Sequence, residues 1–179
     1  MKIVKGCLTV ILIFFILLTI GIVVFNSNNS KQVIADNVKP KKSLMDYKKK
    51  ISERNNMISK SNLPDSVKIL SRKSDSLVKN YKKLKDLLWI EYRINQNIYQ
   101  NKSFETINNE LNETYIQYNS DAKDFNFKWL IFPFNTALSA NNLRSYDLMY
   151  SIDYGKDNSA NMAKRKKAEH WIETGEVIE

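Results

Sequence analysis

The residue types that most often catalyse reactions or bind metals are scarce in this chain of 179 residues. One histidine, His170, and one cysteine, Cys7, exclude a His-based metal cluster, an internal disulfide framework and a Cys-based zinc or iron–sulfur site within a single chain. Four glycines leave no glycine-rich phosphate loop. Glu169 and Glu173 share a helix face, but lysines lie alongside, so solvated salt pairs explain the spacing.

Motifs of hydrolytic enzymes are also missing from the sequence. There is no G-x-S-x-G elbow and no H-E-x-x-H helix. Glu105, Glu110 and Glu113 are dispersed along one predicted helix without a histidine partner. We therefore expect no catalytic, cofactor-binding or metal-ligating residues and no enzymatic activity. A membrane-tethered enzyme of unrecognised type is the alternative.

The chain is basic, with 28 Lys and Arg against 19 Asp and Glu and a net charge of +9. Such a surface attracts anionic lipid or nucleic acid. None of the common nucleic-acid-binding motifs is present, so we expect no nucleic-acid partner. A lysine-rich surface beside a membrane anchor meets lipid headgroups, while a solvated face is the simpler interpretation of the same charges.

An uncharged apolar run over residues 7–25 is the strongest signal in the sequence. As a helix of nineteen residues it spans about 28 Å, close to the hydrocarbon thickness of a bilayer. A soluble helix of that length does not need to be apolar on every face. We predict a transmembrane helix whose ends are Cys7 and Phe25, preceded by a short basic tail over residues 1–6.

Two alternatives compete with a permanent membrane anchor. A cleavable signal peptide has a shorter apolar core and small residues close behind it, whereas the nearest such site here ends at Ala35. A pilin-like leader ends in glycine, as Gly6 does, but pilin-like chains carry a glutamate early in the run, where this chain has Ile11. A pilin-like or secreted subunit stays open as a possibility.

The positive-inside rule does not decide the orientation of this helix. Lys2 and Lys5 favour a cytoplasmic N-terminus, while the lysines that follow the run, from Lys31 to Lys42, oppose it. We expect the large C-terminal part to lie on the non-cytoplasmic side.

Residues 26–42 are polar and contain Pro40, which is typical of a linker. Ser43 then has the sequence context of a helix N-cap, and an amphipathic stripe predicts a helix over 43–60. Pro64 ends the break that follows and starts a second helix.

The spacing of apolar residues predicts this second helix and a third one after it. A heptad pattern runs over 65–99, and a stripe from Phe104 to Phe125 follows a turn at Asn101. Each stripe must be buried against a neighbour, so we predict an all-α fold in which the transmembrane helix is followed by an antiparallel bundle of three to four helices, within residues 43–140.

The last part of the chain is less regular. Residues 127–134 read FKWLIFPF, which is too apolar for an ordinary loop. We interpret them as a lid over one end of the bundle, and an aromatic patch in the membrane interface is the alternative. Residues 141–179 are predicted to be irregular, with a short basic helix over 160–174 that carries the run at 164–167.

One motif in the third helix and the loop after it resembles the C-terminal motif of the LemA family. The family has a Tyr-Asn pair, a small apolar residue, an aromatic-Asn pair and a Phe-Pro-x-Asn segment in that order. The matching positions are Tyr118, Asn119, Ala122, Phe125, Asn126, Phe132, Pro133 and Asn135.

The LemA resemblance implies a membrane-anchored helical bundle in the bacterial plasma (inner) membrane, within the cell envelope, and it implies no enzyme. Its partners would be the lipid bilayer and other membrane or envelope proteins or a second copy of the chain. From the residues alone, Asn119 and Asn126 lie seven apart on one helix face. We interpret them as structural, with side chains that bond the backbone of the Phe132–Pro133 loop.

Overall fold

The computed structural model describes residues 2–80, 84–149 and 152–176. This part of the chain contains helices and no strands, which confirms the all-α prediction. The helices are α1 (Lys2–Asp36), α2 (Val38–Lys60), α3 (Asp65–Asn80), α4 (Leu84–Ile98), a 3-10 turn η1 (Lys102–Phe104), α5 (Glu105–Trp129), α6 (Phe134–Ala140) and α7 (Ser159–Thr174).

The chain divides into two compact units. The first, which we call the α1 unit, consists of Met1–Lys41 and Asp121–Tyr146. The second, the bundle unit, consists of Lys42–Ser120 and Asp147–Glu179. Each unit has its own buried interior and is described separately.

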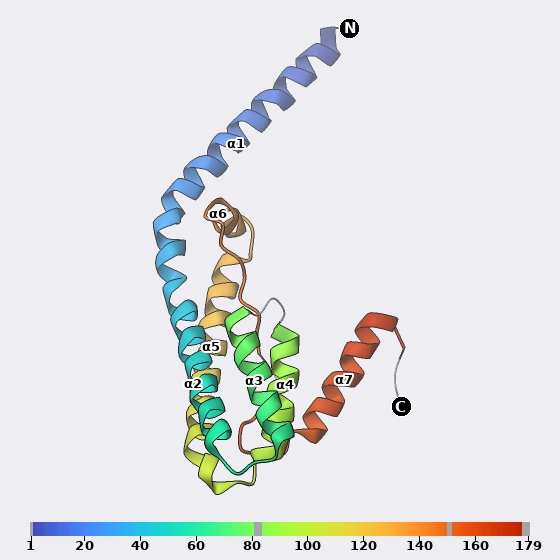
Figure 1. The fold of residues 1–179 in the computed structure, drawn as a ribbon. Helices are drawn as coiled ribbons and strands as arrows, with labels where there is room; N and C mark the ends of the chain where they lie inside the picture. The colour runs from blue at the N-terminus through green and yellow to red at the C-terminus, as the bar shows by residue number, and fades with distance from the viewer. Residues whose placement is uncertain (1, 81–83, 150–151, 177–179) are drawn as a thin grey trace. The chain divides into compact units, whose positions relative to one another are not determined.

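In the bundle unit, α2, α3, α4 and α5 form the predicted helical bundle (Figure 1). The Lys50 ammonium on α2 binds the Glu110 carboxylate on α5 at 2.8 Å. Antiparallel α3 and α4 pack against each other. Apolar side chains from all four helices fill the interior: Ile51, Ile58, Val67, Val78, Leu87, Leu88, Ile94, Ile98, Ile107 and Leu111. Most of these residues lie on the stripes that the sequence periodicity assigned to a core, whereas Val78, Leu87 and Ile94 do not.

The single helix predicted over 65–99 is wrong, because the structure has two helices, α3 and α4, in that range. The apolar heptad pattern continues through the join, from Leu77 to Leu84. Periodicity reports which face of a helix is buried and does not show where the chain reverses. The join at 81–83 lies outside the described residues.

The linker predicted over 26–42 is also wrong, because this stretch is helical almost throughout, in α1 and the start of α2. Val33 is fully buried in it, so tertiary packing overrides the polar composition. Pro40 lies in the first turn of α2, where backbone N–H groups need no partner within the helix. Ser43, predicted as an N-cap, lies inside α2.

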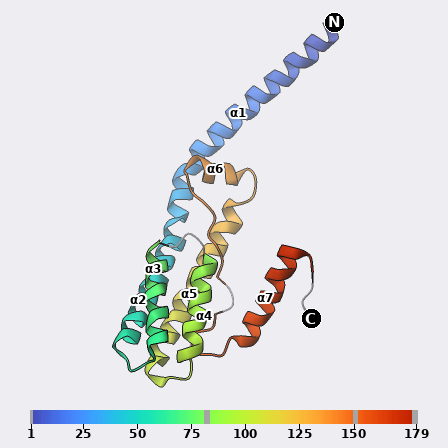
Figure 2. The same ribbon diagram turned by 45° about the vertical axis from the view of Figure 1, so that its right-hand side comes forward.

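In the α1 unit, α6 lies against α1, as the rotated view in Figure 2 shows. The small core of this unit also takes in the C-terminal turns of α5, and it consists of Val33, Phe125, Trp129, Ala137 and Leu138. Leu143 and Tyr146 pack on its edge. The C-terminal half of α1 is therefore held by tertiary contacts, while residues 10–21 are exposed.

Candidate functional site

Over residues 10–21, α1 has no protein neighbour to cover it. Every residue from 10 to 21 is exposed, and large apolar side chains such as Val10, Phe14 and Leu17 are each more than 60% exposed. Among the described residues, one N-terminal helix is long and apolar enough to cross a membrane. The helix continues beyond both predicted ends of the span. Cys7 lies within α1, with its side chain outside the described part, and Phe25 is half-buried.

Just beyond the apolar run, polar and aromatic contacts tie α1 to α6. The Phe25 and Phe134 rings meet edge to face, with centroids 5.4 Å apart. One residue further along α1, the Asn26 Oδ1 atom accepts a hydrogen bond from Thr136 at 2.7 Å. A third contact is the 3.2 Å hydrogen bond from the Asn141 amide to the Ser30 hydroxyl. These contacts fix the position of α6 along α1.

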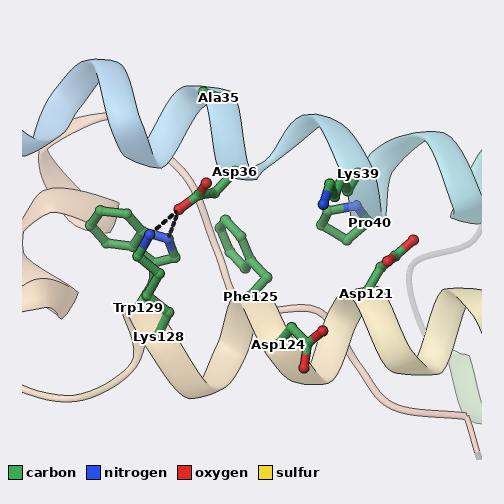
Figure 3. Close-up of a pocket in the computed structure, with 9 residues that line it drawn as sticks. All are labelled: Ala35, Asp36, Lys39, Pro40, Asp121, Asp124, Phe125, Lys128 and Trp129. Atoms are coloured by element: carbon green, nitrogen blue, oxygen red, sulfur yellow. Dashed lines mark hydrogen bonds and ion pairs between the residues drawn. The ribbon is translucent and has the colours of Figure 1, made fainter.

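Further along α1, charged residues replace the apolar ones. Figure 3 shows one oxygen of the Asp36 carboxylate facing both the Lys128 ammonium and the Trp129 indole N–H, which donate to it at 2.7 Å and 3.0 Å. Pro40 and Asp121 belong to the same shallow groove, whose volume is about 210 Å³. Its lining carries both signs of charge, so this groove has no net preference for an anionic or a cationic ligand.

Two asparagines of the LemA-like motif pair with the backbone that follows α6. In the bundle unit, Asn119 accepts from the Met149 N–H at 2.8 Å and donates to the Met149 carbonyl at 2.6 Å. In the α1 unit, Asn126 does the same with Tyr146, at 2.9 Å and 2.7 Å. The bonded segment is therefore 146–149, and the prediction that these side chains hold the Phe132–Pro133 loop is wrong.

A third asparagine, Asn112, extends the pattern by one more heptad. It pairs with both backbone groups of Tyr154 at 2.9 Å. On α4, Asn95 accepts from the Gly155 N–H at 2.9 Å and donates to the Lys156 carbonyl at 2.7 Å. Gly155 has a φ of 81°, which residues with a Cβ seldom adopt. Side-chain amides thus satisfy the backbone of a segment that has no regular structure of its own.

The other motif residues divide between buried and exposed positions. Tyr118 and Ala122 are buried, and the Tyr118 hydroxyl donates to the Asp147 carbonyl at 2.6 Å. By contrast Phe132 is 66% exposed, and Asn135 is exposed near the start of α6. The Phe132–Pro133 peptide bond is cis.

We expect the substitution Asn119→Asp to destabilise the fold by about 1–3 kcal/mol. Aspartate has the same size as asparagine and keeps the oxygen that accepts from the Met149 N–H. Its second carboxylate oxygen, however, faces the Met149 carbonyl, where the asparagine has an N–H donor. The measurement is urea unfolding of the full chain in detergent micelles. The exposed Asn109, on the same helix, supplies the matched control Asn109→Asp. Equal effects of the two substitutions would contradict a role for the Asn119 pairing.

A buried polar network lies at the centre of the bundle unit. The side chains of Arg54 on α2 and Glu91 on α4 are both 0% exposed, and they form a two-pronged ion pair at 2.7 Å and 2.8 Å. Ser74 donates to the same carboxylate at 2.6 Å, and Tyr154 donates at 2.9 Å. Tyr47 then hydrogen bonds the Tyr154 hydroxyl. The network links three helices to the C-terminal segment.

The environment of this network shifts the ionisation of its members. Burial, and then the negative charge of Glu91, raise the pKa of Tyr154 and of Tyr47 well above the ordinary value, so both phenols stay neutral. Burial alone would lower the pKa of Arg54, but the Glu91 carboxylate more than offsets it. A charged guanidinium and carboxylate with two neutral phenols form a compensated set, as a packed interior requires.

A second groove, of about 330 Å³, lies between α4 and α7. Trp89 and Met162 line it together with Arg165 and Glu169, which form an ion pair at 3.1 Å. The α7 helix has no buried residue, and its Trp171 is 57% exposed. Exposed aromatic side chains beside a groove are typical of protein-binding surfaces.

Sequence reasoning missed the buried network and the third asparagine. The repeat of asparagine at intervals of seven, at Asn112, Asn119 and Asn126, indicates that these side chains share one helix face and bond the same segment of chain. No local signal marks Arg54 and Glu91 as partners. Among the described residues, no group of three or more His, Cys, Asp or Glu is placed to hold a metal ion.

Comparison with known proteins assigns no family. No family model matches the chain, and no curated protein or solved structure is significantly similar to it.

Proposed function

We propose that this chain is a single-pass membrane protein of the LemA type, whose helical bundle acts by binding or assembly at the membrane surface.

The observation that carries the proposal is the exposed, uncharged surface of α1 over residues 10–21. Burying an apolar side chain of the size of Leu or Phe contributes about 1.5–3 kcal/mol, and a dozen consecutive exposed positions leave that stabilisation unused in water. The helix has no protein to pack against, so a bilayer is the environment that suits it.

The juxtamembrane contacts support a rigid presentation of the α1 unit. The apolar run passes into the packed part of α1 without a break in the helix. Contacts from Phe25 to Asp36 hold α6 and the end of α5 against it. A flexible tether would leave the unit free to rotate, whereas this arrangement keeps one face of it towards the bilayer.

The LemA motif residues support the family proposal through their structural role. Tyr118, Asn119 and Asn126 hold the segment that follows α6 by bonding its backbone. A motif of this kind serves the architecture of a helical domain and needs no ligand. We place the chain in the bacterial plasma membrane, with the bundle on the non-cytoplasmic side.

The groove between α4 and α7 is the surface that we assign to a partner. Trp89, which is 48% exposed, and the half-buried Met162 are two of the apolar residues that line this groove. In the polar centre of the bundle, the Arg54 and Glu91 charges pair with each other, while the buried Arg54 Nε atom has no hydrogen-bond partner among the described residues. This pairing of the two charges supports binding over catalysis as the role of the domain.

The experiment is co-purification of the intact chain in mild detergent, with quantification of every protein retained, a second copy included. We expect a partner that is retained by the wild type and lost by the double variant Trp89→Ser/Met162→Ser, which changes two residues that line the groove. The control is Met45→Ser, which replaces an exposed apolar residue on α2. Recovery of the chain as a monomer alone, or equal retention by all three proteins, would overturn the proposal.

A further inference from the structure

A cluster of apolar side chains faces outward at the turn between α5 and α6. Leu130, Ile131 and Phe132 are consecutive and are 47%, 59% and 66% exposed. Phe134, at the start of α6, is 37% exposed. We call residues 130–134 the tip. Three adjacent large apolar residues facing water are unfavourable unless something covers them.

The tip is held beside the point where the apolar run of α1 ends. The Phe134 ring contacts Phe25, the last residue of that run, and it also contacts the Trp129 ring at a centroid distance of 5.8 Å. Thr136, two residues later, bonds Asn26, the first polar residue of α1 after the run. The tip is thus fixed at the level where the helix changes from apolar to polar.

The contacts of α6 also give its direction relative to the membrane end of α1. Phe134 meets Phe25, and Asn141 meets Ser30, so α6 leads away from the apolar run as its residue numbers rise. The residues before Phe134 therefore lie at the membrane end. The charged contact of Asp36 with Lys128 lies further along α1, on the watery side.

We propose that the tip is a second membrane contact, inserted into the interfacial layer of the same leaflet in which α1 ends. This inference rests on the proposed function, because it needs α1 to span the bilayer. Apolar and aromatic side chains at this level enter the headgroup and acyl boundary to a depth of about 5–10 Å. The occupant is lipid, since Phe134 of the tip packs on Phe25, at the end of the apolar run that faces lipid.

The test uses depth-dependent quenching in vesicles of phosphatidylcholine and phosphatidylglycerol. The full chain with Cys7→Ser carries one new cysteine, from Phe132→Cys or, as a second variant, Ile131→Cys. An environment-sensitive fluorophore on that cysteine is quenched by spin-labelled lipids or by aqueous iodide. Both substitutions replace exposed side chains, so they should leave the fold intact.

Two reference positions calibrate the result. Leu17→Cys reports from the middle of the apolar run, and Val38→Cys reports from an exposed residue of the same unit beyond it. We expect the label at 17 to be quenched most by deep spin labels and the labels at 131 and 132 by shallow ones. The label at 38 should lose intensity with iodide only.

The outcomes separate this inference from the proposed function. Labels at 131 and 132 that behave like the label at 38 would overturn the tip contact while the span stands. Labels shielded from both lipid and iodide would overturn it too, because a protein would then cover the tip. A label at 17 that no lipid probe quenches would overturn the span itself.

Discussion

Replacing Glu91 with alanine is expected to destabilise the bundle by about 3–5 kcal/mol, because the substitution leaves the Arg54 charge buried without its partner. Each carboxylate oxygen of Glu91 accepts two hydrogen bonds. One oxygen takes an Arg54 N–H and the Ser74 hydroxyl, and the other takes an Arg54 N–H and the Tyr154 hydroxyl. All of these donors lose their acceptor together.

The measurement is denaturant unfolding of the full chain in micelles, followed by near-ultraviolet circular dichroism. Glu110→Ala is the matched control, since its ion pair with Lys50 is partly exposed, and it should cost less than about 1 kcal/mol. The double variant Arg54→Met/Glu91→Leu should recover most of the loss, because it removes both buried charges. If Glu91→Ala costs no more than Glu110→Ala, the network does not stabilise the bundle.

The second large effect concerns the span, where the double variant Ile13→Arg/Leu17→Arg is expected to prevent stable insertion of α1. An arginine near the centre of a transmembrane helix costs about 2.5–3.5 kcal/mol, so two of them offset much of the insertion free energy. The readout is the fraction of full chain that stays with membranes after extraction at alkaline pH. We expect the wild type to stay and the variant to enter the supernatant.

The control places the same charges on exposed apolar residues of the bundle unit, as Met45→Arg/Ile116→Arg. Both proteins gain two positive charges, so a general effect of charge would move them equally. Loss of the control from the membrane together with the span variant would contradict the role of α1.

The helices were predictable wherever apolar spacing or apolar length reports burial directly. Residues 7–25 are apolar on every face, and the structure places them in a helix whose residues 10–21 are all exposed. The stripe from Phe104 to Phe125 becomes the buried face of η1 and α5. In the first case the helix is apolar all round because no face of it is covered by protein. In the second case the apolar residues recur at the spacing of one helix face, and that face is the buried one.

The remaining features depend on contacts between distant residues. Arg54 and Glu91 are 37 positions apart, and each is an ordinary charged residue in its own segment. Asn119 and Asn126 were identified, but their partners at 146–149 come from a segment with no pattern of its own. The polar stretch 26–42 is helical because Val33 is buried against α5 and α6 residues, which local composition does not report.

The alternatives for residues 127–134 also needed the structure. Trp129 turns inward and is fully buried, while Phe127 is 77% exposed and Phe132 is 66% exposed. A lid would bury most of these side chains. A segment that buries one aromatic residue and exposes the rest supports the interfacial alternative. Its contact with Phe25 places it beside the end of the apolar run of α1.

The central claim is that α1 crosses a bilayer, and protease protection of the full chain in sealed vesicles tests it most directly. Trypsin is unsuitable, because no Lys or Arg lies between Lys5 and Lys31 and the same fragment forms with or without a membrane. With proteinase K, we expect a protected fragment that contains residues 10–21, identified by mass spectrometry, which disappears when detergent is added. Digestion of that segment in intact vesicles, at the same rate as the bundle, would contradict it.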